Sequence, residues 1–399
     1  MHRGEEIGLS DAERRGLVSN HVLLVLSLVG LAAALGLAFV THAPNRLVSG
    51  QPISLLAAAH GARAVALLPG IAILATLFLP QRTAVHAITL VASGAFLLAL
   101  CWLAGAEAAA LAGPSSPAAR TSLGAGFWTL SLCAALALAD AVRRLDLGPA
   151  ASIPIGMAVI GAVALLGAAG AFDQLSIVKE YAGRRDVFAA AVTRHIVIVA
   201  AALIPTVLLG PPLGIAAYRN QRIAAVAFPI LNIVQTIPSI ALFGLLMAPL
   251  SGLAVLFPGL ATLGISGIGL APAVIALFFY SLLPIVRNTV EGLATVPAAA
   301  IEAARAMGMT RRQSFWRVEL PLAAPVFLTG LRITAVQAIG LAAVAALIGA
   351  GGLGSIMFEG VFANAQDLTL LGALPVILLA VITDAVLRLL TAYVERIPA

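Results

Sequence analysis

Long apolar runs recur from one end of this chain to the other, and they limit its possible folds more than any other feature. A helix that crosses the hydrocarbon core of a bilayer needs about 20 mostly apolar residues. Runs of about this length lie at residues 20–40, 62–80, 84–104, 123–140, 152–172, 195–217, 223–248, 271–290, 323–348 and 369–391. The sequence therefore predicts an all-α polytopic membrane protein with about ten transmembrane helices.

Composition supports this class and argues against others. Of the 399 residues, 61% are apolar and 10% are charged, whereas a soluble domain has about 45–50% apolar and about 25% charged residues. The net charge of +6 does not indicate nucleic-acid binding, because the arginines fall between the apolar runs and not on one face. The single lysine, Lys179, is followed by Glu180, so it cannot belong to a G-x-x-x-x-G-K-[ST] phosphate-binding loop.

The distribution of arginines predicts the orientation of the chain. An even number of spans places both termini on the same side of the membrane. The segments on that side carry most of the arginines, including Arg143–Arg144 and Arg311–Arg312. Because cytoplasmic segments are enriched in arginine and lysine, both termini are predicted to be cytoplasmic. Residues 249–270 are apolar but interrupted by proline and glycine, and we interpret them as an outer loop, with partial insertion left open.

The polarity of the spans changes along the chain. Residues 1–175 carry few polar groups within their spans and end in a polar stretch, 173–194. Polar residues become frequent within the spans after Arg194. We therefore predict two modules: an N-terminal extension, 1–185, with about five transmembrane helices, and a C-terminal core, 186–399.

The segment 291–321, on the predicted cytoplasmic side, carries clear local signals. Gly308 follows strong helix-forming sequence. We expect Gly308 to adopt the left-handed backbone conformation that commonly ends a helix, and so to end a first short helix. Thr310 and Gln313 have the spacing of a capping box that begins a second helix, which Pro321 is expected to stop. The segment is thus predicted to form two short helices at the membrane surface.

The same segment resembles the EAA loop of ATP-binding-cassette importer permeases. Glu302-Ala303-Ala304, three further residues, Gly308, nine further residues, Val318, one residue and Leu320-Pro321 follow that pattern, with valine in place of the usual isoleucine. In that family the loop docks into a groove of the ATPase subunit and transmits its closure to the pore. The resemblance implies that the coupling residues are Glu302, Ala303, Ala304, Gly308, Leu320 and Pro321. Without the resemblance, an interfacial amphipathic helix with no partner remains an alternative.

A second resemblance covers about 190–390. The stretches ILNIVQTIPSIALFGLL (230–246), ALFFYSLLPIVRNTVEGL (276–293) and ALIGAGGLGSIMFEG (346–360) resemble permeases that import glycine betaine, choline, carnitine or proline betaine. It implies that the last five spans form a type I ABC importer (MetI-like) permease core. Residues 1–185 resemble, by length and span count, the extra N-terminal spans of a long subgroup of these permeases.

Polar residues within the core spans are candidates for the substrate path. Four of them are spaced three and four apart and would share one face of a single helix. They could line a path or could join neighbouring helices by hydrogen bonds, and both readings stay open. The candidates are Asn232, Gln235, Thr236, Ser239, Tyr280 and Gln337.

Two charged residues lie within predicted spans, where charge is costly. In one interpretation Arg332 extends its head towards the membrane surface while Asp384 pairs with Arg388 one turn away. In the other, an Arg332–Asp384 bridge joins the fourth and fifth core spans. Charge reversal at both positions would distinguish the two.

Together the resemblances imply a transport subunit and not an enzyme. ATP and magnesium would be bound by a separate ATPase subunit, and no cofactor is expected in this chain. The expected partners are that ATPase, an extracytoplasmic substrate-binding protein, a second permease copy (identical or paralogous) and membrane lipid, with no nucleic acid. The expected location is the bacterial cytoplasmic (inner) membrane. Alternatives are a permease for an amino acid or other small polar solute, or an ion-coupled secondary transporter, which would need carboxylates such as Asp384 on its path.

Overall fold

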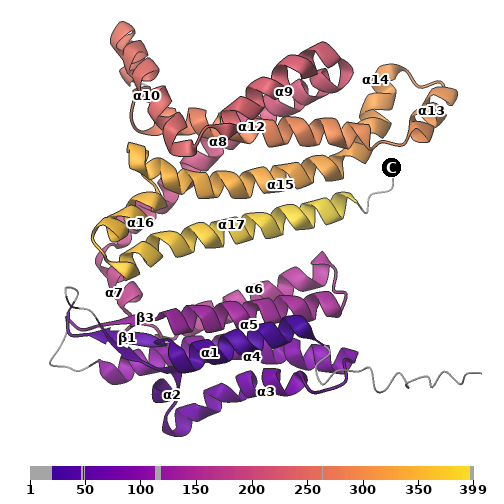
Figure 1. The fold of residues 1–399 in the computed structure, drawn as a ribbon. Coiled ribbons are helices and arrows are strands. Elements are labelled where there is room, and N and C mark those ends of the chain that lie inside the picture. The colour runs from indigo at the N-terminus through magenta and orange to yellow at the C-terminus, as the bar shows by residue number, and fades with distance from the viewer. Residues whose placement is uncertain (1–19, 46–47, 49, 113–117, 263, 396–399) are drawn as a thin grey trace, which may run out of the picture. The chain divides into compact units, whose positions relative to one another are not determined.

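The computed structural model describes residues 20–45, 48, 50–112, 118–262 and 264–395. The chain divides into two compact units, Met1–Lys179 and Glu180–Ala399. In Figure 1 the first runs from indigo to purple and the second from magenta-pink to yellow. The extreme termini, on which the predicted orientation depends, lie outside the described residues.

The N-terminal unit is built around one long central helix. Its helices are α1 (His21–Gly36), α2 (Leu55–Ala58), α3 (Leu68–Thr76) after the 3-10 turn Gly61–Leu67, α4 (Thr83–Leu111), α5 (Ala125–Arg144), α6 (Pro149–Ala168) and α7 (Ser176–Gly183), which runs on into the second unit. Helix α4 packs against α3, α5 and α6, while α1 packs against α5. The side chain of Asn20 caps α1 by accepting a hydrogen bond from the Leu23 amide.

A small sheet, which the sequence analysis did not predict, joins three connections of this unit. Strands β1 (Val40–Ala43), β2 (Gln51–Ile53) and β3 (Arg120–Leu123) form an antiparallel sheet in the order β2-β1-β3. Phe39, which precedes β1, and Val40, its first residue, are fully buried, with Phe127 of α5 and Leu103 of α4 in the same core. The sheet pairs backbone groups in segments that leave the helices, and β1 is bonded along both of its edges.

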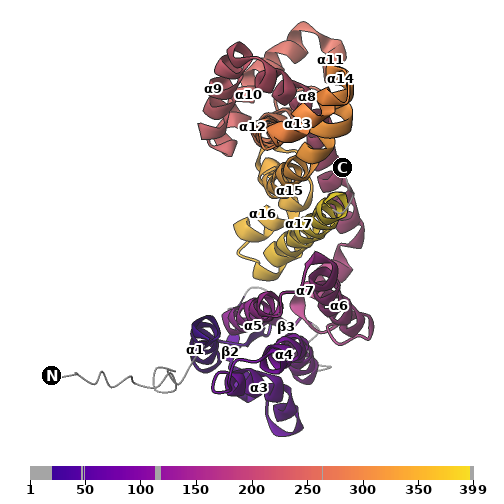
Figure 2. The same ribbon diagram turned by 90° about the vertical axis from the view of Figure 1, so that its right-hand side faces the viewer.

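The C-terminal unit is a helical bundle with a helical loop at one end. Its helices are α8 (Arg185–Arg219), α9 (Gln221–Thr236), α10 (Ser239–Leu256), α11 (Pro258–Thr262), α12 (Leu270–Ala294), α13 (Ala298–Ala306), α14 (Arg311–Ser314), α15 (Leu320–Val344), α16 (Leu353–Phe362) and α17 (Gln366–Val394). Helix α12 packs on α8 and α15, and α15 packs on α17. Figures 1 and 2 show α13 and α14 at one end of these long helices, and α16 lies at the other end in Figure 1.

The number of long apolar helices approaches the predicted number of spans. Within the described residues, eight helices are long and apolar enough to cross a membrane, and three shorter apolar helices accompany them: His21–Gly36, Gly61–Thr76 and Leu353–Phe362. The predicted runs 20–40 and 62–80 correspond to two of these shorter helices. The polytopic, mainly helical class is therefore confirmed, and ten is an approximate count.

The predicted single span 223–248 is wrong. The chain leaves the helical conformation at Ile237, which is extended (φ −71°, ψ 126°), and α10 begins after Pro238. A proline disfavours helical backbone in the residue before it, which accounts for the break. The prediction of a loop over 249–270 is also wrong in its first part, because α10 continues through Pro249 and α11 follows it.

Candidate coupling loop and substrate path

The loop between α12 and α15 follows its local sequence signals. Helix α13 begins after Pro297 and ends before Gly308. The φ of Gly308 is +77°, which is the left-handed backbone conformation. The capping box is confirmed. The Thr310 hydroxyl oxygen accepts a hydrogen bond from the backbone N–H of Gln313 at 3.3 Å, and the side-chain oxygen of Gln313 accepts one from the backbone N–H of Thr310 at 2.9 Å. The loop geometry is therefore specified by residues close together in the sequence.

Pro321 does not stop the second short helix, contrary to the prediction. Helix α14 continues through a π-helical turn, Phe315–Glu319, and the Leu320 amide donates to the Phe315 carbonyl. Pro321 is the second residue of α15, directly after the π-helical turn, so the helix accommodates a proline that donates no backbone N–H to the preceding turn. The loop is thus continuous with the membrane helix α15.

The six motif residues divide into exposed and anchored positions. Glu302, Ala303, Gly308 and Pro321 are exposed, while Leu320 is half-buried. Ala304 is only 1% exposed. The exposed part of α13 is available to another protein, and its small residues allow a close approach.

A small apolar cluster holds the loop against the membrane helices. Leu293 of α12, Val296, Phe315 and Ala323 of α15 are buried together, with Ile301 of α13 packed against them. Helix α13 is therefore in packed contact with both α12 and α15.

The predicted polar stripe on α9 is interrupted. Asn232 and Thr236 are exposed, and Thr236 donates its hydroxyl hydrogen bond to the Ile233 carbonyl of its own helix. Ser239 lies beyond the break, as the first residue of α10. The four residues therefore do not form one continuous helical face, because Pro238 ends the helix between them.

Gln235 and Tyr280 connect the α9–α10 break to α12. The Gln235 amide donates to the Tyr280 carbonyl at 2.5 Å, and the Tyr280 hydroxyl donates to the Ile237 carbonyl. Tyr280 is 6% exposed and packs in the core with Phe243 of α10. The second bond satisfies a carbonyl at the break, and the first satisfies the Tyr280 carbonyl of α12, to which Pro284 four residues later can donate no N–H. Sequence spacing did not indicate this pairing, which joins residues 43 positions apart.

The remaining candidates lie apart from this contact. Arg287 of α12 donates to the Asn232 amide oxygen at 3.4 Å. Gln337 is exposed on α15, and the structure shows no hydrogen bond from its side chain to any described residue. Gln235 and Tyr280 thus bond directly, Asn232 reaches α12 through Arg287, and Gln337 lies separately on α15.

Asp384 of α17 contacts both arginines that the sequence offered as alternatives. Its Oδ1 lies 3.6 Å from Arg332 Nε of α15, and its Oδ2 accepts from Arg388 one turn along α17. The Arg332 and Asp384 side chains are 29% and 32% exposed. The structure therefore contains both the Arg332–Asp384 bridge between the helices and the local Asp384–Arg388 pair.

Arg194 and His195 were not recognised as functional candidates from the sequence. The turn that precedes α16 has left-handed glycines at 349, 351 and 352. Arg194 Nε donates to the Ala350 carbonyl of that turn at 2.9 Å, and the fully buried His195 ring bonds the Ile339 carbonyl at 3.1 Å. The adjacent Arg-His pair within an apolar run was the available signal, since polar groups in a membrane span need partners.

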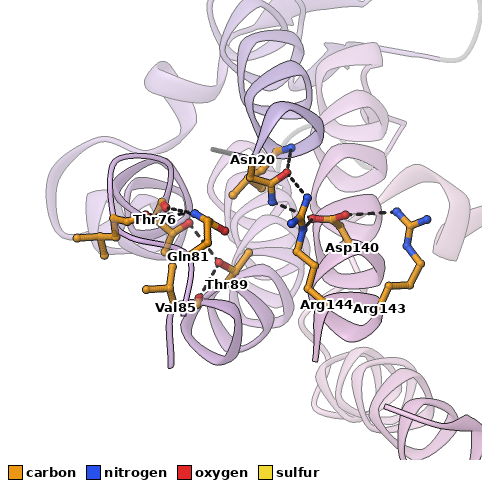
Figure 3. A network of polar contacts seen from close by, with 10 residues as sticks. Asn20, Thr76, Gln81, Val85, Thr89, Asp140, Arg143 and Arg144 are labelled. Carbon is orange, nitrogen blue, oxygen red and sulfur yellow. Dashed lines mark hydrogen bonds and ion pairs between the residues drawn. The ribbon is translucent and has the colours of Figure 1, made fainter. Parts of the chain in front are cut away.

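The N-terminal unit contains its own buried polar cluster. Figure 3 shows Asp140 of α5 accepting from Asn20 at 2.9 Å and pairing with Arg144 at 2.7 Å, with Arg143 on its other oxygen at 3.3 Å. Arg144 also donates to the Asn20 oxygen at 2.8 Å. The cluster joins the start of α1 to the end of α5 and leaves the 5%-exposed Asp140 fully paired. Across the described part of the chain, no group of three His, Cys, Asp or Glu side chains could hold a metal ion.

Comparison with known proteins identifies the class of this bundle and loop. Residues 188–396 match the family described as the binding-protein-dependent transport system inner membrane component, and residues 18–178 match the N-terminal domain of the ABC transporter permease YehY. The fold and loop thus define the membrane-embedded transport subunit of an ABC system, in which ATP hydrolysis belongs to a separate subunit. The chain belongs to the binding-protein-dependent transport system inner membrane component family.

Several curated relatives are similar to about half of this chain. The osmoprotectant import permease protein OsmW of Salmonella typhimurium is 42% identical over 195 residues, which is 49% of this chain and 86% of that protein. The glycine betaine/carnitine/choline permease OpuCD of Bacillus subtilis is 38% identical, covering 49% and 78%. The choline permease OpuBB of Bacillus subtilis is 40% identical, covering 48% and 82%. A solved inward-facing MetNI methionine ABC transporter has 25% identity and a TM-score of 0.45, covering 53% of this chain and 97% of that one.

Proposed function

We propose that this chain is the permease subunit of an ATP-driven importer for an osmoprotectant such as glycine betaine or choline. The observation that carries the proposal is the 42% identity over 195 residues to an osmoprotectant import permease. Its partners are a separate ATPase subunit that binds ATP and magnesium, an extracytoplasmic substrate-binding protein and a second permease copy, identical or paralogous. The chain lies in the bacterial inner membrane with both termini in the cytoplasm.

We propose that α13 is the coupling element of this subunit. Glu302, Ala303 and Gly308 present the surface that meets the ATPase, while Ala304 fixes α13 to the bundle. Leu320 and Pro321 begin the helix that receives the movement. The support is the exposure of the first group, the burial of Ala304 and the continuous helical connection into α15.

The proposed cycle is alternating access. ATP binding closes the two ATPase subunits, the α13 helices are drawn together, and the inner end of the path closes as the outer end opens. The binding protein then releases its ligand into the path. Hydrolysis of ATP returns the inward-facing state.

We propose two roles for the path residues. Asn232, Thr236 and Gln337 are exposed within the single chain and would face the path in the two-copy assembly. Gln235 and Tyr280, with Ser239 after the break, would shape the path by holding the α9–α10 break against α12. With few aromatic side chains at the path, recognition of the cargo rests mainly with the binding protein.

We propose that residues 1–185 form an extension separate from the transport core, 186–399. Support comes from the division of contacts between Lys179 and Glu180 and from the family matches, which end at 178 and begin at 188.

The test is uptake of radiolabelled glycine betaine into proteoliposomes that contain the chain, its ATPase and its binding protein. Gly308→Val should reduce ATP-dependent uptake about tenfold, because a left-handed conformation costs a residue with a side chain roughly 1–2 kcal/mol. Gly308→Asn is the matched control, since asparagine tolerates this conformation, and its uptake should stay near wild type.

The outcomes separate the parts of the proposal. Uptake that needs no ATP would contradict the ABC mechanism. If the chain stimulates the ATPase but no glycine betaine is taken up, the assignment of the cargo would be wrong and the assignment as a permease subunit would stand.

A further inference from the structure

A basic hollow lies beside the coupling loop, where the end of α8 meets α13 and α14. Its volume is about 860 Å³, and Arg219, Arg305, Arg311 and Arg312 line it. The lining includes one carboxylate, Glu319, which already accepts a hydrogen bond from Ser314 at 3.2 Å. In the described ranges of the chain, none of these four arginines forms an ion pair.

Unpaired guanidinium groups around one hollow favour an anion. Four positive charges repel one another, and an anion among them removes that repulsion. The Arg219 guanidinium is already placed, since it lies 4.8 Å from the centre of the Phe315 ring. Arginine presents planar pairs of N–H donors that match phosphate oxygens, so a phosphate group is the ligand chemistry that fits best.

The position of the hollow indicates a lipid as the source of that phosphate. Arg219 is the last residue of α8, which is long and apolar enough to cross a membrane. Trp316 and Tyr218, also in the lining, are 59% and 39% exposed. Tryptophan and tyrosine gather at the level of lipid headgroups, and basic pockets at the ends of membrane helices bind anionic headgroups.

The hollow is distinct from the surface proposed to meet the ATPase. Helix α13 contributes Ile301 and Arg305 to it, which are one turn apart on one face. Glu302 and Ala303 are exposed but do not line it.

We propose that this hollow binds the headgroup phosphate of an anionic phospholipid. The lipid would connect α8 to α13 and α14 by contacts additional to the apolar cluster beneath the loop. The proposal concerns the permease alone and does not require the ATPase, the binding protein or a particular cargo.

The experiment is native mass spectrometry of the purified full chain from nanodiscs of phosphatidylcholine with increasing phosphatidylglycerol. Each basic residue near an anionic surface contributes about fivefold to binding, so Arg311→Gln/Arg312→Gln should weaken phosphatidylglycerol retention roughly thirtyfold. Arg311→Lys/Arg312→Lys should retain most of the binding and shows that the loop still folds. Arg82→Gln is the matched control, because Arg82 is exposed and does not line the hollow.

The other outcomes overturn the proposal. Equal retention in the wild type and in the glutamine double variant would exclude a lipid site here. Displacement of the lipid by millimolar inorganic phosphate would assign the hollow to a soluble anion. Unchanged lipid retention with lost co-purification of the ATPase would assign it to the subunit interface.

Discussion

At the residue scale, two carboxylates in long apolar helices are held by arginine partners. Asp384 is held between Arg332 of the neighbouring helix and Arg388 of its own. Asp140 has the same kind of environment in the N-terminal unit, between Asn20 and Arg144. Removing one member of such a group leaves the others uncompensated in a medium that solvates charge poorly.

The Arg332–Asp384 bridge predicts a recovery on charge exchange. Arg332→Asp and Asp384→Arg should each lower the thermal stability of the chain in detergent, because each places like charges side by side. The double exchange should recover part of the loss, with a coupling free energy of about 0.5–3 kcal/mol. Arg388→Gln measures the local pair separately. A double variant whose destabilisation equals the sum of the single variants would show that the bridge contributes nothing.

At the element scale, proline has different effects according to its position. Pro238 separates α9 from α10, and the tyrosine and glutamine bonds to α12 compensate the break. Pro321 is accommodated in the first turn of α15, after a π-helical turn. Helix contacts in the bundle depend on small residues: a Cβ at Gly214 of α8 would lie 2.6 Å from the Thr289 Cβ of α12.

This close approach predicts a specific effect of adding one methyl group. Gly214→Ala should destabilise the chain by about 1–3 kcal/mol, because α8 and α12 must separate or distort to accept it. Gly340→Ala is the matched control on α15, since nothing lies within 4 Å of its added Cβ. That variant should be neutral or slightly stabilising, because alanine favours helix over glycine. Thermal unfolding in detergent measures both, and equal melting temperatures would contradict the close packing.

At the scale of the whole molecule, two compact units are joined near residue 180. The coupling loop, the path candidates and the basic hollow all belong to the second unit. The first unit has its own apolar core, its own sheet and its own buried polar cluster. It therefore contains the elements of an independently packed body.

This organisation predicts that the core transports without the extension. A chain beginning at residue 180 should insert, assemble with the ATPase and import glycine betaine with ATP dependence, because every proposed coupling and path residue is retained. The measurement is uptake in proteoliposomes at matched protein content, with the full chain as control. Complete loss of uptake in a truncated chain that still binds the ATPase would assign the extension an essential role in transport.

Local signals in the sequence were sufficient for several features. The apolar runs predicted a polytopic helical protein, since burial in lipid requires about 20 apolar residues in succession. Gly308 and the Thr310–Gln313 box predicted the form of the loop, because these interactions join residues at most a few positions apart. Resemblance in the loop and core stretches indicated the permease family before any contact was visible.

The tertiary structure alone decided the contacts between distant residues. The hydroxyl of Tyr280 meets a carbonyl 43 positions away, and Asp384 meets Arg332 across two helices. The β-sheet, the burial of Ala304 and the convergence of four arginines on one hollow likewise depend on how helices pack. A linear pattern specifies which residues can pair, but helix packing brings particular pairs within bonding distance, because hydrogen bonds and ion pairs act only over a few ångströms.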